Sequence, residues 1–156
     1  MTAKIQDYKA MPMERKRIMR ALALSQEERL FELMGSLGDL PPFEYLRRPQ
    51  KGLIMAKARA EATKVAFNLG EVLVTRCSVS VKGRIGHAYI LGDVPEKCLA
   101  AALAEALAQD EVYGPGIEKM VLCLEEDLAR ARAMENIQTQ KTKVEFFTLV
   151  RGEDEN

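Results

Sequence analysis

The sequence predicts an α+β protein in which helices flank an antiparallel or mixed sheet with a central hairpin. Apolar side chains recur at helical spacing through the first forty residues. Segments rich in valine and threonine then meet at a Lys82-Gly83 turn, and alanine- and leucine-rich stripes of helical period follow Pro95. This order of helices, hairpin, helices and a final strand differs from the regular strand–helix alternation of a parallel sheet, and it therefore favours α+β.

The N-terminal segment, residues 1–40, is expected to form a helical pair that makes an arm of the molecule. The first helix is predicted over residues 13–24, because apolar side chains recur there every three to four positions. Residues 25–28, Ser-Gln-Glu-Glu, fit a capping box and predict the start of the second helix. The residues of this second helix expected to face inward are Leu30, Phe31, Leu33, Met34 and Leu37.

The strands are expected to begin after the two prolines at positions 41–42, which forbid further helix. Residues 53–59 form a possible first strand. Residues 71–81 are rich in valine and threonine and predict a second. A two-residue turn at Lys82-Gly83 would return the chain antiparallel over residues 84–91.

The second half is expected to hold two helices and a last strand. An alanine- and leucine-rich helix is predicted over residues 96–109, and Gly-Pro-Gly at 114–116 interrupts the chain. A long helix should follow over residues 117–139, and residues 143–151 are expected to form a C-terminal strand. The chain is thus interpreted as a single domain over 1–156, composed of the arm, a sheet-and-helix core over 50–152 and a tail over 153–156.

Composition excludes several classes of function. The chain has 156 residues, and its 23 basic residues balance its 23 acidic residues, so nothing in its net charge steers it toward nucleic acid or membrane. No apolar run approaches the roughly 20 residues of a membrane helix, and the first residues lack the apolar centre of an export signal. The three cysteines are scattered and there is one histidine, so we expect no disulfide framework, no metal and no cofactor in a cytoplasmic protein.

The predicted hairpin brings polar side chains onto one face. With the turn at Lys82-Gly83, Ser78 opposes His87 and Arg76 opposes Tyr89, and side chains alternate between the faces of a strand. An arginine fork and hydroxyl donors suit a phosphate, a phosphonate or the polar groups of a partner. Three interpretations stay open, namely a solvated sheet face, a contact with a partner and a contact with a ligand.

The other face of the hairpin is small and apolar, as a packed surface should be. Thr75, Cys77 and Val79 oppose Ile90, Ala88 and Gly86 on this face. We therefore interpret Cys77 as a buried structural cysteine rather than an activated thiol. No catalytic residue follows from the sequence, and Arg76 and His87 are the only candidates for such a role.

Four motifs, in order along the chain, resemble one known family. Residues 67–77 read Phe-Asn-Leu-Gly-Glu-Val-Leu-Val-Thr-Arg-Cys, and residues 86–92 read Gly-His-Ala-Tyr-Ile-Leu-Gly. An alanine-rich helix ends with Glu-Ala-Leu-Ala-Gln at 105–109, and residues 142–152 read Thr-Lys-Val-Glu-Phe-Phe-Thr-Leu-Val-Arg-Gly. These segments are similar to those of the PhnG family, the G subunit of the phosphonate carbon–phosphorus lyase system.

The resemblance implies a cytoplasmic role in the use of organic phosphonates. In the family, the G subunit assembles with the H, I and J subunits into a two-fold symmetric core, and an L subunit joins them for the first step. In that step a phosphonate displaces adenine from ATP and yields ribose 1-phosphonate 5-triphosphate. Nucleosidase chemistry is attributed mainly to the I subunit, and radical carbon–phosphorus cleavage to the J subunit. ATP and phosphonate are thus expected substrates of the complex, with no cofactor on this chain.

Three hypotheses about function follow. The first is a structural subunit that is not catalytic alone and forms a homodimer within the complex. The second is a subunit that contacts the triphosphate or phosphonate directly through Arg76 and His87. The third is a stand-alone binding protein, because the family's glycine-rich turn before residue 67 is replaced here by Glu-Ala-Thr-Lys-Val-Ala at 61–66. The expected ligand or interface positions are Arg76, Ser78, His87, Tyr89, Phe146, Phe147 and Arg151.

Overall fold

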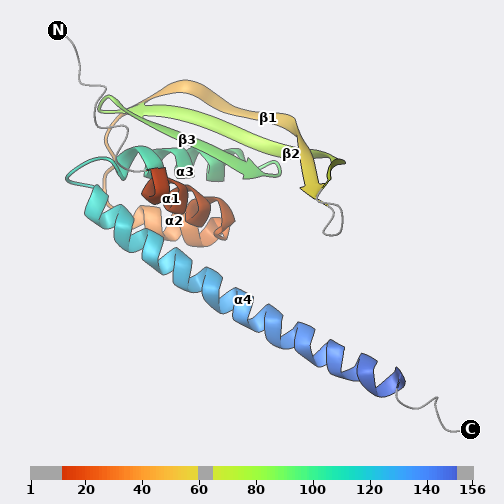
Figure 1. The fold of residues 1–156 in the computed structure, drawn as a ribbon. Coiled ribbons are helices and arrows are strands. Elements are labelled where there is room, and N and C mark those ends of the chain that lie inside the picture. The colour runs from red at the N-terminus through yellow and green to blue at the C-terminus, as the bar shows by residue number, and fades with distance from the viewer. Residues whose placement is uncertain (1–11, 60–64, 151–156) are drawn as a thin grey trace, which may run out of the picture.

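The computed structural model describes residues 12–59 and 65–150, and it confirms an α+β fold (Figure 1). Four helices and three strands are found in the described part of the chain. In chain order they are α1 (Pro12–Leu24), α2 (Glu27–Gly35), β1 (Phe43–Arg59), β2 (Ala66–Val81), β3 (Arg84–Leu91), α3 (Pro95–Leu107) and α4 (Gly114–Val150).

The sheet is antiparallel, with β2 in the centre and β1 and β3 at the edges. Helices α1, α2 and α3 lie on one side of it, and α3 packs directly against β2 and β3 (Figure 1). No described element covers the opposite side, which we call the open face of the sheet. Any site on the sheet surface therefore belongs to this open face or to the rims of the sheet.

The hairpin has the predicted turn and register. Lys82 has φ 48° and Gly83 has φ 76°, the left-handed backbone that a type I′ turn requires at both central positions. Ser78 pairs with His87, and the pairing continues along β2 and β3 without a shift. A shift of the pairing register by one residue would move every side chain of a strand to the other face. This turn therefore determines which side chains reach the open face.

The core lies between the sheet and α3, where both surfaces carry small side chains. On the strands, Cys77, Val79 and Ala88 are buried, as predicted for this face. Helix α3 meets them with a run of buried alanines, and Gly86 is so close to α3 that a β-carbon there would stand 2.7 Å from the Ala106 amide nitrogen. Small residues on both sides thus allow a close approach of helix and sheet.

Helices α1 and α2 pack into the same core. Leu22 of α1 and Leu30 of α2 are at most 1% exposed and belong to one cluster with the strand and α3 residues. The predicted capping box is wrong, because the Ser25 hydroxyl donates to the Leu22 carbonyl oxygen, 2.8 Å away, and no side chain accepts a hydrogen bond from the first-turn amides of α2 as a cap. The buried Lys97 ammonium donates to the Ser25 carbonyl oxygen and holds this corner against α3.

Strands β1 and β2 are longer than the sequence predicted. β1 begins at Phe43 rather than at 53, and β2 begins at Ala66 rather than at 71. Because β3 pairs only as far as Val74 of β2, residues 53–59 and 66–73 form a two-stranded extension. We call this extension the ribbon, and it lies beyond the helices that cover the rest of the sheet (Figure 1).

The predicted C-terminal strand over 143–151 is wrong, because α4 continues as helix to Val150. No glycine or proline interrupts residues 117–150, and each added helical residue gains one backbone hydrogen bond once the helix exists. Helix α4 also begins at Gly114 rather than at 117. Its second half extends away from the rest of the molecule (Figure 1). None of the described helices has a stretch long and apolar enough to cross a membrane.

Candidate functional site on the open face of the sheet

The four polar residues predicted to share a hairpin face do lie together in the structure. Arg76 and Ser78 of β2 stand directly opposite Tyr89 and His87 of β3. The Ser78 hydroxyl oxygen and the His87 Nδ1 atom are joined by a hydrogen bond of 2.9 Å, and Tyr89 is 53% exposed. Their shared face is thus confirmed, while their functional role stays a prediction.

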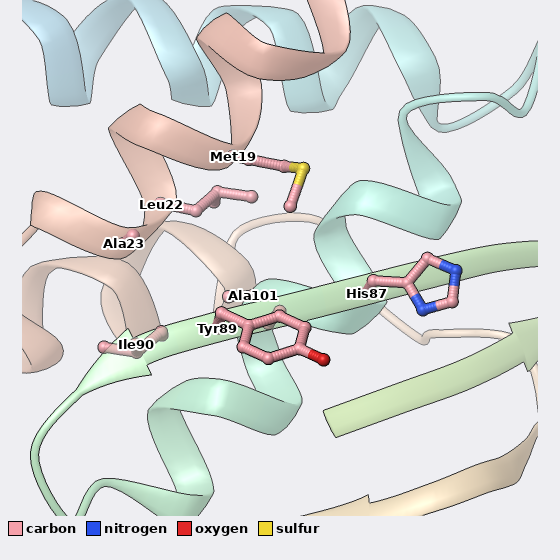
Figure 2. Close-up of a pocket in the computed structure, with 8 residues that line it drawn as sticks. Met19, Leu22, Ala23, His87, Tyr89, Ile90 and Ala101 are labelled. Atoms are coloured by element: carbon pink, nitrogen blue, oxygen red, sulfur yellow. The ribbon is translucent and has the colours of Figure 1, made fainter. Parts of the chain in front are cut away.

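The small cavity beside His87 and Tyr89 is too small for a substrate. It has a volume of about 30 Å³ and lies between α1 and β3. Figure 2 shows the Met19 side chain reaching from α1 toward the strand, opposite Tyr89 and Ile90. A space of this size holds little more than one water molecule, and most of its lining is apolar. It is therefore a packing defect at the rim of the sheet.

A buried carboxylate that the sequence analysis missed fixes the position of His87. Glu105 of α3 is 2% exposed, and its Oε2 atom accepts a hydrogen bond of 2.8 Å from the His87 backbone amide. Its other oxygen forms an ion pair with Arg15 of α1. Glu105 therefore links α1, α3 and β3 at one point. The only sign of this in the sequence is a lone carboxylate within an alanine and leucine stripe.

A second group of residues missed from the sequence lies on β1. Arg47, Arg48 and Arg76 line an open hollow of about 610 Å³, which we call the basic hollow. Glu44 and Gln50 also contribute to its lining, together with neighbouring strand residues. The two β1 arginines were not predicted as site residues, because the first strand was expected to begin at residue 53 and it begins at Phe43. Arg76 thus faces β1 neighbours as well as the predicted Tyr89.

Irregular pairing of β1 with β2 shapes this hollow. Tyr45 pairs with Val79, Arg47 with Ser78 and Gln50 with Arg76, so β1 uses five steps where β2 uses three. Such bulges place extra residues in one strand and change the direction of its side chains. Pro49 is tolerated here because β1 is an edge strand.

Two of the three cysteines, Cys77 and Cys98, are buried, as was expected for Cys77. Cys77 and Cys98 are 0% exposed and contact backbone carbonyl oxygens, Cys77 that of Arg47 and Cys98 that of Thr75. Burial raises the pKa of the Cys77 thiol, and burial together with the neighbouring Cys77 raises the pKa of Cys98 to about 12. Both thiols are therefore protonated and unreactive at neutral pH.

Two acidic residues of α4, Glu125 and Asp127, are held by arginines of α1 and α2. Glu125 accepts hydrogen bonds of 2.8 Å from Arg17 of α1, and Asp127 accepts one of 3.0 Å from Arg29 of α2. Among the residues with described side chains, no group of three or more potential ligands is arranged to hold a metal ion. These pairs instead attach α1 and α2 to the first half of α4.

The remaining predicted positions lie at the C-terminal end. Phe146 and Phe147 belong to α4 rather than to a strand, so the predicted interface strand does not exist. Arg151 and the predicted tail lie outside the described residues, as does most of the segment in which the family's glycine-rich turn was expected.

Comparison with known proteins assigns the chain to a family. A sequence profile described as "Phosphonate metabolism protein PhnG" matches residues 13–152. The chain is also 31% identical over 142 residues to the α-D-ribose 1-methylphosphonate 5-triphosphate synthase subunit PhnG of Rhizobium meliloti (strain 1021). This alignment covers 90% of this chain and 91% of the relative. The chain therefore belongs to the PhnG family of phosphonate metabolism proteins.

Proposed function

We propose that this chain is a structural subunit of an α-D-ribose 1-methylphosphonate 5-triphosphate synthase that acts in organic phosphonate use in the cytoplasm. The name of the Rhizobium meliloti relative and the family match support this proposal. Within the complex, ATP and a phosphonate are the substrates, and adenine is released. The chain contributes the geometry of the assembly, while the H, I, J and L subunits are its partners and carry the chemistry.

The ribbon is the observation that carries the proposal. Leu53, Met55, Leu69 and Leu73 are 40% to 64% exposed on this two-stranded extension. An isolated two-stranded ribbon is marginally stable in water, and a cluster of exposed apolar side chains is typical of a protein interface. The ribbon therefore needs a surface supplied by another polypeptide. The edge of β1 offers that polypeptide unpaired backbone groups along its length.

Helix α4 supports the same conclusion. Its buried residues end at Leu124, whereas residues 131–139 are all exposed, with Met134 at 69% and Ile137 at 55%. A helix this far from its own core gains no tertiary packing, and packing provides most helical stability in proteins. In our proposal the second half of α4 packs on a partner or on a second copy of this chain.

Capture by partner subunits tests the proposal. The tagged chain should retain the I subunit, and the double variant Leu53→Asp/Leu73→Asp should lose it because each change places a charge in the apolar contact. Val112→Asp is the matched control, since Val112 is 77% exposed but lies in the loop before α4. Equal capture by all three proteins would contradict the proposal, and failure of the unchanged chain to capture any partner would favour the stand-alone alternative.

Activity gives a second test. The purified chain alone should release no adenine from ATP and methylphosphonate, whereas the assembled complex should release it. Turnover by the isolated chain would overturn the structural role. Mixing Arg76→Ala with the other subunits distinguishes direct ligand contact, which predicts normal assembly with loss of turnover, from interface contact, which predicts loss of assembly.

A further inference from the structure

We infer that the basic hollow is a binding site for a phosphate-type oxyanion, with Arg47, Arg48 and Arg76 as its ligand-binding residues. The inference does not depend on the proposed function, because it rests on the charges and burial of this chain alone. A linear polyphosphate group, which carries several charges, is the ligand chemistry that fits three guanidinium groups best.

The positive charges of the three arginines in the basic hollow are not compensated by carboxylates. Arg15, Arg17 and Arg29 on the helices all pair with carboxylates. The part of the chain with described side chains supplies no ion pair to any of the three arginines of the basic hollow, as is also true of the exposed Arg20 and Arg132, but only in the hollow do three such arginines line one space. Three guanidinium groups thus share one hollow with a single carboxylate, that of Glu44. An anion entering the hollow meets a net positive potential.

The Nε atom of Arg76 lacks a hydrogen-bond acceptor among the described residues. This N–H group is buried and has no hydrogen-bond partner among the described residues. A buried donor without an acceptor costs free energy, and the cost is larger when the group is charged. Because the Nε atom itself has almost no accessible surface, an oxyanion in the hollow would bind the outer part of the guanidinium group, and a small shift of this half-buried side chain would let Nε share the same acceptor. Arginine suits the task because its planar fork donates two parallel hydrogen bonds to phosphate oxygens.

Strand β1 carries Arg47 and Arg48 beside two bulges and an aromatic ring. The Arg48 guanidinium carbon lies 5.0 Å from the centre of the Tyr45 ring, so a cation–π contact orients it. The bulges on either side of Arg47 add residues to β1 where it passes Arg76 and Ser78. Both arginines are exposed and line the same hollow as Arg76. The two arginines are therefore carried by the backbone of an edge strand, and one of them, Arg48, is also oriented by an aromatic ring.

Size distinguishes the basic hollow from the cavity beside His87. The basic hollow is an open surface depression of about 610 Å³, which leaves room for a solvated anion, whereas the cavity of about 30 Å³ holds little more than one water molecule. Because the hollow is open and polar, it suits a solvated anion better than an apolar ligand. The Gln50 amide adds another donor to the lining.

Calorimetric titration of the full chain with inorganic triphosphate tests the inference. The unchanged chain should bind saturably, and binding should weaken as salt rises. Arg76→Gln should weaken binding about tenfold or more, because it removes a charged hydrogen-bonding group. Arg47→Gln and Arg48→Gln should each weaken it as well, and because both residues are exposed these variants are informative even if Arg76→Gln is unfolded by circular dichroism.

Arg132→Gln is the matched control, because Arg132 is an exposed arginine on the second half of α4 and should not affect binding. Equal triphosphate affinity in Arg76→Gln and Arg132→Gln, or no binding by the unchanged chain, would overturn the inference. A glutamate-rich peptide that binds more tightly than triphosphate through the same arginines would also overturn it, since the hollow would then be a protein contact. Because partner capture is measured separately, absence of triphosphate binding by an unchanged chain that still captures its partners contradicts this inference alone.

Discussion

Glu105 shows how one residue determines where a candidate site lies. Its carboxylate is almost fully buried, yet it accepts a hydrogen bond from the His87 backbone and pairs with Arg15. A buried charge is tolerated only when it is paired and hydrogen-bonded, and removing one partner leaves the others uncompensated. The position of His87 on the open face therefore depends on a residue of the opposite layer.

Replacing Glu105 tests this dependence. Glu105→Ala should lower the free energy of unfolding by about 3 kcal/mol, because the Arg15 charge and the His87 amide lose their partner in a buried environment. Glu32→Ala removes an exposed partner of Arg29 and should cost at most about 1 kcal/mol. Urea unfolding followed by circular dichroism measures both values. Equal costs for the two variants would contradict the buried role of Glu105.

The two buried thiols give a prediction that depends on pH. Cys77 and Cys98 should resist iodoacetamide in the folded chain at pH 8, because burial raises both pKa values. Mass spectrometry after short labelling measures this, with labelling in urea as the control. Rapid modification of folded Cys77 would show that it is an activated thiol.

The raised pKa of Cys98 makes the stability of the folded chain depend on pH. The folded pKa of Cys98, about 12, lies above its ordinary value of 9.0, so the protonated thiol favours the folded state. Its stabilising contribution is complete below pH 9.0 and is lost as the pH rises toward about 12. Cys98→Ala should therefore lose less stability than the unchanged chain over that interval.

At the residue scale, the sequence predicted the part of the site that follows from alternation along the hairpin. Once the turn is located at Lys82-Gly83, pairing alone places Arg76, Ser78, His87 and Tyr89 on one face. The roles of Arg47 and Glu105 could not be predicted from the sequence. Their roles depend on bulges and on tertiary packing, which leave no periodic signal in the sequence.

At the scale of elements, the contact of α3 with β3 depends on Gly86. A side chain at this position would collide with the α3 backbone, including the Ala106 amide. Gly86→Ala should therefore destabilise the fold by about 3 kcal/mol, because backbone atoms cannot move aside as a side chain can. Gly52→Ala is the control, since nothing lies within 4 Å of a β-carbon there. Thermal unfolding measures both, and a stable Gly86→Ala variant would contradict the close approach.

Two segments, residues 143–150 and Phe43–Arg59, show the limits of pattern reading. Residues 143–150 contain valine, threonine and two phenylalanines, which are common in strands. However, Val144, Phe147 and Val150 are three positions apart, and this spacing also fits one face of a helix. The continuous helix prevails because no breaker separates this segment from the rest of α4. In the second segment, Phe43–Arg59 contains a proline and several charged residues. These features make an exposed edge strand difficult to predict from its sequence.

At the scale of the whole molecule, α4 divides into a half that belongs to the fold and a half that does not. Removing residues 133–156 should leave the melting temperature within about 2 °C of the unchanged chain, because residues 133–139, whose side chains the structure describes, are all exposed. The truncated chain should nevertheless capture less of its partners. Differential scanning fluorimetry and pull-down measure the two effects, and a large loss of stability would show that the distal half supports its own fold.

The unpaired edge of β1 has a consequence for how much of this protein a cell can hold. Seventeen residues of strand present backbone donors and acceptors on one side, next to apolar side chains that water disfavours. A molecule without companions offers the same edge to any identical neighbour, and such contacts extend without closing. Surplus copies should therefore precipitate or be degraded, so synthesis of this chain must keep pace with that of the proteins that cover it.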